Sequence, residues 1–201
     1  MSFDFLNSVS DFLTSLLAIL FAISIHEFGH AFVAHLNGDN TAKNAGRMTI
    51  NPLNHIDPFG MIMMFLVHFG WAKPVPVNPY NYRNEKIGNI TVSIAGVAFN
   101  LISAIIFALI NKYVDVVSIK TITYSLVMYN IGFAAFNILP IPPLDGWNII
   151  ATFLPNDLVY KIYSYSRYTT ILFIVLIMTN AFSIILNPIY MFFYRIVMLF
   201  L

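Results

Sequence analysis

The sequence predicts an all-α polytopic membrane protein with about five to six membrane segments. Hydrophobic residues make up 59% of its 201 residues and charged residues only 9%, and the mean hydropathy is +0.77. This balance lies far outside that of a soluble domain, so lipid is the expected solvent for most of the chain. Charge-poor runs of about 20 residues recur along it, and a backbone in lipid must satisfy its polar groups within a helix.

The apolar runs give the expected order of membrane segments. Full spans are predicted at residues 12–36, 88–111, 121–139 and 169–187. A shorter run at 58–70, flanked by proline and glycine, suits either a re-entrant segment or a full crossing. The tail at 189–201 suits either the end of a broken last helix or an interfacial helix. We expect one integral-membrane domain over 1–201, with its core at 12–150 and C-terminal membrane helices at 169–201.

A short non-helical arm is predicted between the first and second full spans. Its sequence, KPVPVNP at 73–79, alternates valine with proline, a pattern that excludes a helix and favours an extended strand or a polyproline-like segment. Such an arm could offer backbone hydrogen bonds to an extended substrate. A rigid connector explains the same pattern equally well.

Composition excludes some functions and restricts others. The net charge is +1 and the basic residues are scattered, so a nucleic-acid partner is not expected. The chain has no cysteine, so any zinc must be held by His, Asp or Glu. The first 13 residues carry Asp4 and Asp11 but no Lys or Arg, which is unlike a signal peptide, and we expect the first helix to be retained.

Lys and Arg in short loops predict the sidedness of the chain. If 58–70 is re-entrant, the other side holds only Lys112 and Lys120. The side expected to be cytoplasmic collects Lys43, Arg47, Lys73, Arg83, Lys86, Lys161 and Arg167. The N-terminus is then expected outside the cell.

The chemistry is concentrated in the first span, in His26, Glu27 and His30. Histidines four residues apart share one face of a helix and can bind one ion, while Glu27 points about 100° away and can reach a metal-bound water. Glu27 is one of only two glutamates in the chain, and ionisable groups within a membrane span are functional hypotheses. A buried His–Glu hydrogen-bond cluster is the structural alternative.

A catalytic zinc commonly takes a third protein ligand, and Asp145 is the best candidate. It lies in LPIPPLDG at 139–146, where prolines interrupt the helix, and irregular backbone at membrane depth is tolerated where it lines a cavity. The alternative for Asp145 is a simple turn or cap residue. His35 points off the shared face, and structural roles suit the remaining candidates better: His55, Asp57 and His68.

Taken together, several motifs resemble the site-2 protease family of intramembrane zinc metalloproteases, in the compact form without PDZ or CBS domains. They are HEFGHAFVA at 26–34, NPLNHIDPFG at 51–60, GWAKPVPVNPYNYRN at 70–84 and FNILPIPPLDG at 136–146. The resemblance implies one Zn²⁺ held by His26, His30 and Asp145, with Glu27 as general base. It also implies that Asn137 contacts the substrate or the oxyanion, although a helix-packing hydrogen bond would explain Asn137 as well.

The sequence departs from the family pattern at one point. The family commonly carries Ala-Gly-Pro-x-x-Asn in the next helix, whereas AGVAFN at 95–100 lacks the proline. The change should alter local helix geometry and touches no expected metal ligand. The resemblance implies a transmembrane protein or peptide substrate, a lipid bilayer environment and an active site nearer the cytoplasmic face. The competing functions are an ion transporter, which predicts two related halves, and a metal-binding scaffold without catalysis.

Overall fold

The computed structural model describes residues 2–67, 70–165, 175 and 181–200. Within these ranges the chain is helical, and one isolated antiparallel bridge joins Ile56 to Ala72. The helices are α1 (Ser2–Leu36), α2 (Thr41–Asn44), α3 (Pro58–Val67), α4 (Glu85–Tyr113), α5 (Val117–Asn137), α6 (Asp145–Ala151), α7 (Asn156–Ser164) and α9 (Ala181–Met198), with short 3-10 turns η1 (Pro52–Asn54) and η2 (Pro79–Asn81).

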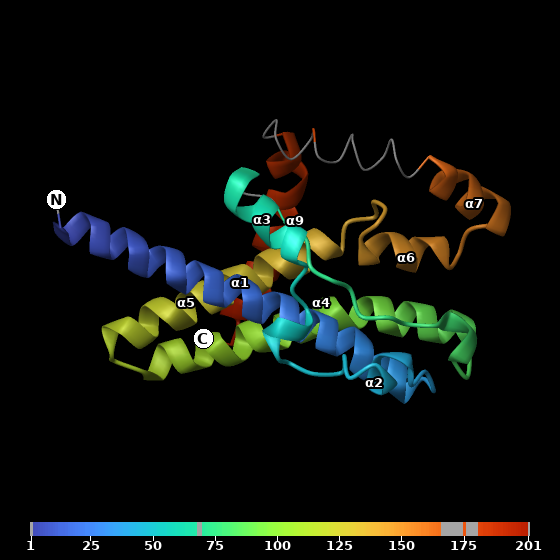
Figure 1. Ribbon diagram of the computed structural model, residues 1–201, viewed down its shortest axis with the longest axis horizontal. Helices are drawn as coiled ribbons and strands as arrows, with labels where there is room; N and C mark the ends of the chain where they lie inside the picture. Colours follow the sequence, from blue (N-terminus) through green and yellow to red (C-terminus); the bar gives the residue numbers. More distant parts are fainter. Residues whose placement is uncertain (1, 68–69, 166–174, 176–180, 201) are drawn as a thin grey trace.

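Three long helices, α1, α4 and α5, pack against one another and form the body of the molecule (Figure 1). The N-terminus of α1 and the α4–α5 connection lie at one end of this body, and α2 lies at the other. The short helices α6 and α7 follow α5, and α6 packs on α4. Two segments far apart in sequence, the C-terminal half of α1 and the start of α6, therefore approach the same helix.

Local sequence explains where the long helices end. Gly38 has φ +107°, a left-handed conformation that glycine adopts without strain, and it stops α1 after Leu36. The side chain of Asn84 accepts a hydrogen bond from the backbone N–H of Ile87 and so caps the start of α4. These two signals leave residues 37–84 to form the connection that contains the predicted arm.

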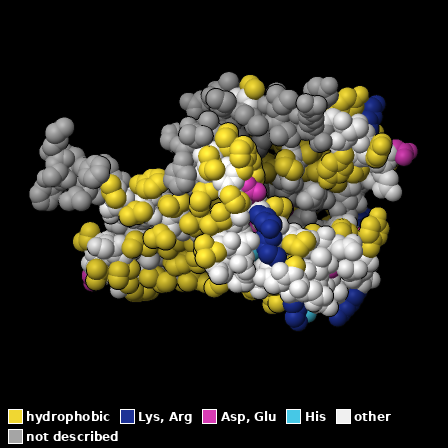
Figure 2. All heavy atoms as spheres, viewed as in Figure 1, with side chains coloured by type: hydrophobic (Ala, Val, Ile, Leu, Met, Phe, Trp, Pro, Cys, Tyr) yellow, Lys and Arg dark blue, Asp and Glu magenta, His cyan; other side chains and the backbone are white. Residues whose placement is uncertain are grey.

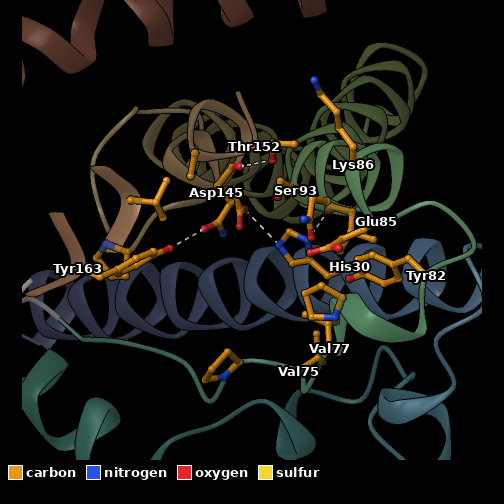
Figure 3. Close-up of a pocket in the computed structure, with 18 of the residues that line it drawn as sticks. His30, Val75, Val77, Tyr82, Glu85, Lys86, Ser93, Asp145, Thr152 and Tyr163 are labelled. Atoms are coloured by element: carbon orange, nitrogen blue, oxygen red, sulfur yellow. Dashed lines mark hydrogen bonds and ion pairs between the residues drawn. The ribbon is translucent and has the colours of Figure 1, made fainter. Parts of the chain in front are cut away.

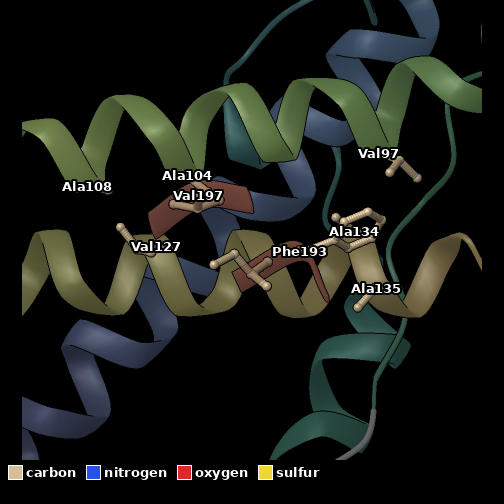
Figure 4. Packing of buried hydrophobic residues seen from close by; sticks show 9 residues of the cluster. Val97, Ala104, Ala108, Val127, Ala134, Ala135, Phe193 and Val197 are labelled. Carbon is tan, nitrogen blue, oxygen red and sulfur yellow. The ribbon is translucent and has the colours of Figure 1, made fainter. Parts of the chain in front are cut away.

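Small residues allow the helices to approach closely. Ala22, Ala31 and Ala34 of α1 are fully buried, as are Ala134 and Ala135 of α5. Small residues at helix crossings are typical of membrane proteins, where close van der Waals packing replaces hydrophobic burial. The largest buried apolar cluster joins α4, α5 and α9 (Figure 4), and its members are Val97, Ala104, Ala108, Val127, Ile131, Ala134, Ala135, Phe193 and Val197.

The outer surface is strongly apolar. Leu17 on α1 is 60% exposed and Ile102 on α4 is 54% exposed, which suits a lipid environment better than water. Figure 2 shows apolar side chains covering much of the visible face toward the N-terminal end of α1, whereas Lys and Arg gather toward the end that holds α2. Within the described residues, two stretches are long and apolar enough to cross a bilayer, Val9–Leu36 and Glu85–Tyr113.

The structure agrees with the all-α prediction but confirms only part of the membrane plan. Helices α1 and α4 cover the predicted spans at 12–36 and 88–111, and α5 covers residues 121–137 of the span predicted at 121–139. Helix α5 is not among the two stretches that are long and apolar enough to cross a bilayer. Most of the predicted span at 169–187 lies outside the described residues. Five to six membrane segments and a single domain over 1–201 stay predictions.

Two shorter segments also differ in detail from what the sequence suggested. The ten residues of α3 span about 15 Å, roughly half a bilayer core, which favours the re-entrant alternative for 58–70. The tail at 189–198 is not a separate helix, because α9 continues through Pro188. Proline removes one backbone N–H from a helix without necessarily ending it, and membrane helices tolerate this loss.

Candidate metal centre

Helix α1 brings His26 and His30 together, one turn apart and both buried. Their Nε2 atoms lie 3.0 Å apart. The imidazoles fit closely against α4 because Gly96 has no side chain there. A Cβ at Gly96 would lie 2.5 Å from Cε1 of His26 and 2.6 Å from Nε2 of His30. The predicted pairing of the two histidines on one helical face is therefore what the structure has.

Asp145 is the first residue of α6 and reaches the same point from the other end of the chain. Its Oδ2 lies 3.0 Å from Nε2 of His26 and 3.1 Å from Nε2 of His30. The turn after α5 positions Asp145. In this turn the backbone N–H of Leu144 donates to the carbonyl oxygen of Ile141, just before α6 begins. The alternative role of Asp145, a simple cap, is not what this geometry shows, because the carboxylate points at both imidazoles.

The hydrogen bonds around the imidazoles leave three lone pairs facing one another. Nδ1 of His30 lies 2.7 Å from the carbonyl oxygen of Val92, which can only accept, so Nδ1 carries the hydrogen. Nδ1 of His26 lies 2.7 Å from Oδ1 of Asn100 and donates in the same way. A neutral imidazole then has a bare Nε2. Oδ2 of Asp145 is buried and has no hydrogen-bond donor.

This cluster fits a zinc ion. Two imidazole nitrogens and one carboxylate oxygen are a common ligand set of catalytic zinc. Ligands of a tetrahedral zinc ion lie about 3.3 Å apart, because each bond is about 2.0 Å long. The observed separations of 3.0 to 3.1 Å are close to that value. His26, His30 and Asp145 also form the one metal-binding group found among the described residues.

Glu27 lies in the same cavity as the three ligands and is buried. Its Oε2 accepts a hydrogen bond of 2.7 Å from the backbone N–H of Val75, in the arm. The carboxylate is thus held from outside its own helix. Glu27 is thus held apart from the group formed by His26, His30 and Asp145, and its role as general base stays a prediction.

The arm is tied down at both of its ends. The side chain of Arg47 donates to the carbonyl oxygens of Lys73 and Pro74 at one end. At the other end Asp39, which follows α1, accepts a hydrogen bond of 2.7 Å from the backbone N–H of Asn78. Residues 73–78 are not helical, as predicted, and Asn78 has an extended backbone, whereas the last residue of the predicted arm, Pro79, begins the 3-10 turn η2.

Asp39 is held in its charged form. Burial works to raise the pKa of this carboxyl, but hydrogen bonds from Asn81, Thr41 and the backbone of Asn78 outweigh burial and lower it. Nearby, burial and the negative charge of Asp39 raise the pKa of Tyr82 to about 12, so its phenol stays protonated at neutral pH.

A cavity of about 780 Å³ opens beside the three ligand atoms (Figure 3). Its walls come from α1, the arm, the first half of α4 and the α6–α7 region. Polar side chains also line the cavity, among them Glu85, Lys86, Asn148, Asn156 and Tyr163. A space of this size next to the candidate metal could admit water and an extended segment of polypeptide.

The remaining candidates from the sequence lie elsewhere. His35 is at the end of α1, where its Nδ1 lies 2.6 Å from Oδ1 of Asn40. His55 donates to the carbonyl oxygen of Thr49, and Asp57 accepts from the backbone N–H of Gly60 at the start of α3. His68 lies outside the described residues.

Asn137 does not line the cavity. Its side-chain N–H group donates to the carbonyl oxygen of Phe133 in its own helix, at 2.9 Å. A contact of Asn137 with substrate or oxyanion therefore stays a prediction, and it would require a change of side-chain conformation.

Three contacts at the site were not predicted from the sequence. Gly96 and Asn100 belong to the family element at 95–100 that the sequence resembles, but their contacts with the histidines were not foreseen, nor was the hydrogen bond from the backbone N–H of Val75. A buried asparagine in the middle of an apolar span was the available signal for Asn100, because polar groups within a membrane are costly unless they serve a purpose. No such signal marked Val75, whose contribution comes from its backbone.

Comparisons with known proteins agree with this site. The chain is 35% identical over 182 residues to the Bacillus subtilis (strain 168) protein named "Putative zinc metalloprotease YwhC", covering 86% of this chain and 83% of that protein. It is 26% identical over 193 residues to "Putative zinc metalloprotease Rip2" of Mycolicibacterium smegmatis, covering 88% and 71%. No family model and no solved structure matches the chain.

Two histidines and an aspartate that could hold a metal ion, beside a buried glutamate, fit a zinc metalloprotease, and the names of these relatives support that class. Within this class, the chain belongs to the site-2 protease family.

Proposed function

We propose that this protein hydrolyses a peptide bond in or near a transmembrane segment of a membrane protein, with one zinc ion. The observation that carries the proposal is the meeting of three ligand atoms within 3.0 to 3.1 Å of one another, beside a buried glutamate. Bound zinc would lower the pKa of a water molecule and polarise the substrate carbonyl.

The protein supplies the proton transfer and the positioning. The Glu27 carboxylate would take the proton of the attacking water and pass it to the departing amide nitrogen. The Val75 backbone N–H holds Oε2 of Glu27 in place, which leaves the rest of the carboxylate to act as base. The cavity between the arm and α4 has room for an unwound stretch of substrate.

A substrate within the membrane is supported by the depth of the ligands. His26 lies ten residues before the end of α1, or about 15 Å along it, within a stretch apolar enough to span a bilayer. Lys43, Arg47 and Lys73 lie in the connection after α1, and such a basic loop is expected on the cytoplasmic side. We therefore place the multi-pass chain in the membrane with its site nearer the cytoplasmic face.

The decisive experiment compares zinc content and cleavage in purified variants. Glu27→Gln should keep zinc but lose cleavage of a membrane-embedded model substrate by at least about 100-fold, because it removes the general base. His26→Ala and Asp145→Asn should lose zinc as well. The matched control is Glu85→Gln, which alters the only other glutamate of the chain. Glu85 lines the same cavity but is not part of the metal-binding group, so this variant should keep zinc and retain most of the cleavage.

Mass analysis of the products would locate the cut relative to the substrate's apolar segment. Equal cleavage by Glu27→Gln and the unaltered protein would disprove the base. Zinc binding by the unaltered protein without cleavage would instead favour the metal-binding scaffold.

A further inference from the structure

Asn100 lies in the middle of α4, is 0% exposed and touches the candidate metal centre from behind. Its Oδ1 accepts the hydrogen of Nδ1 of His26 at 2.7 Å. Its side-chain N–H₂ group donates to the carbonyl oxygen of Ala22 at 2.9 Å and to Oδ1 of Asn130 at 2.8 Å. These hydrogen bonds join three helices, α1, α4 and α5, at the point where they meet.

The orientation of the Asn100 amide is set by its neighbours. The carbonyl oxygen of Ala22 can only accept, so the N–H₂ group must face it and Oδ1 must face His26. Asn130 adds a second acceptor on the N–H₂ side. Asn130 is itself 0% exposed, and its own N–H₂ group donates to the carbonyl oxygen of Leu126 at 2.8 Å. The N–H₂ groups of Asn100 and Asn130 therefore both donate to acceptors other than His26, and only Oδ1 of Asn100 faces that histidine.

The two histidines differ in what orients them. His30 donates to a backbone carbonyl, that of Val92, which no substitution removes. His26 depends on a side chain, that of Asn100. A metal-bound histidine is oriented by the acceptor at its other nitrogen, and loss of that acceptor weakens metal binding. Any effect of the asparagines should therefore act through His26.

We propose that Asn100 is a positioning residue of the metal centre and that Asn130 acts through it. Asn100 keeps the hydrogen of His26 on Nδ1 and so presents a bare Nε2 to the ion, while Asn130 prevents the Asn100 amide from turning over. This inference rests on the proposed zinc site but not on the proposed cleavage, because it concerns metal affinity alone.

The test measures zinc affinity by competition with a chromogenic chelator, using the purified full chain in detergent. Asn100→Leu, which keeps the size of the side chain but no hydrogen bond, should weaken zinc binding by about 10- to 100-fold. Asn130→Leu leaves the bond to His26 available and should weaken it by a smaller factor, about threefold to tenfold.

Asn111→Leu is the matched control. Asn111 also lies on α4 and donates to Oγ1 of Thr123 on α5 at 2.7 Å, so the variant removes an interhelical bond between the same two helices. It lies eleven residues beyond Asn100 and away from the ligands. Its zinc affinity should equal that of the unaltered protein, whatever happens to its thermal stability.

Asn100→Asp separates positioning from simple packing. Aspartate can still accept from His26 but cannot donate to Ala22, so zinc affinity should recover toward the unaltered value while the thermal stability of the metal-free protein falls. Unchanged affinity in both Asn100→Leu and Asn130→Leu would overturn the proposal. So would an equal loss in Asn111→Leu. If Asn100→Leu does not fold, Asn130→Leu decides alone by the same measurement.

The result of this zinc-affinity test can be distinguished from the result of the cleavage test of the proposed function. Zinc binding that depends on Asn100 in a protein without cleavage would support the positioning role and contradict the protease. Cleavage by a protein whose zinc affinity is unchanged in both asparagine variants would support the protease and contradict the positioning role.

Discussion

Gly96 shows how closely the metal centre is built into the helix packing. It lies on α4 directly against the imidazoles, and a Cβ there would come within 2.5 to 2.7 Å of His26 and His30. Atoms of real side chains do not approach that closely, so one of the histidines would have to move. The lack of a side chain at this position is thus part of the candidate metal centre.

Gly96→Ala should therefore lower zinc affinity by at least about tenfold, because it displaces a ligand ring from its position. The control is Gly132→Ala on α5, where the nearest atom to an added Cβ is Cε2 of Tyr190 at 3.9 Å, an ordinary contact. Gly132→Ala should keep zinc and raise helix stability by up to about 1 kcal/mol. Zinc titration and thermal unfolding of the two variants check this. Normal zinc affinity in Gly96→Ala would show that the rings can shift without cost.

The sequence alone was enough to predict the candidate ligands and the candidate base, but not the residues that orient them. His26, Glu27 and His30 follow from helical spacing alone, since all three lie on one helix. Asp145 was identifiable because prolines interrupt a span just before it. The partnership of Asn100 with His26 depends on how α4 is rotated and shifted against α1, and no local pattern in a single sequence encodes that register.

The arm holds the side chain of Glu27 through a hydrogen bond from its backbone. Proline at positions 74 and 76 removes backbone donors, so Val75 and Val77 keep the N–H groups between them. The N–H group of Val75 donates to Glu27. The N–H group of Val77 has no hydrogen-bond partner among the described residues. Val77 lines the cavity, and under the proposed function we expect its N–H group to donate to an extended substrate backbone.

Val75→Pro should reduce kcat by about 10- to 100-fold with zinc content unchanged, because a hydrogen bond to a carboxylate contributes about 1.5–3 kcal/mol. Val77→Pro is the matched control for the loss of an N–H group and for added stiffness. It should leave Glu27 in place and act, if at all, on KM. Steady-state cleavage with both variants distinguishes these outcomes. An equal loss of kcat in the two variants would mean that stiffness alone is responsible.

The connection between α1 and the arm should respond to acid. The pKa of Asp39 is lower in the folded protein than in the unfolded chain, where it is about 3.9, so the carboxylate stabilises the fold above that pH. This stability is lost as the pH falls from about 4 through the lower folded pKa. Asp39→Asn should unfold at a lower temperature than the unaltered protein at pH 7, and the difference should shrink toward pH 3. Thermal unfolding with a zinc chelator present measures it, and a difference independent of pH would contradict it.

The overall plan of long helices could be predicted because apolar runs of about 20 residues determine it. The short helices α2, α6 and α7 were not predicted, since each has at most nine residues, far fewer than the apolar runs of about 20 residues that indicate membrane spans. The prolines in 140–143 indicated that the helix is interrupted there, but they did not indicate the turn that directs the Asp145 side chain toward the two histidines. How elements pack around a site depends on contacts between distant residues, which a single sequence does not display.

The native chain has no cysteine, so single cysteines can report its sidedness directly. Asn44 on α2 and Asp115 in the α4–α5 connection are exposed and lie at opposite ends of the molecule (Figure 1). In intact bacterial cells a membrane-impermeant maleimide should label Asp115→Cys, and it should label Asn44→Cys only after the cells are opened. The reverse pattern would place the metal centre nearer the outer face.

The two histidines and Asp145 come from parts of the chain separated by 115 residues, from His30 to Asp145. An ion shared among them closes a loop of that length, much as a disulfide would in a protein that had cysteines. Zinc would then act as a cross-link as well as a cofactor, fastening α6 to α1. Metal-free protein should therefore be the less stable form, with its carboxylate segment the first part to detach.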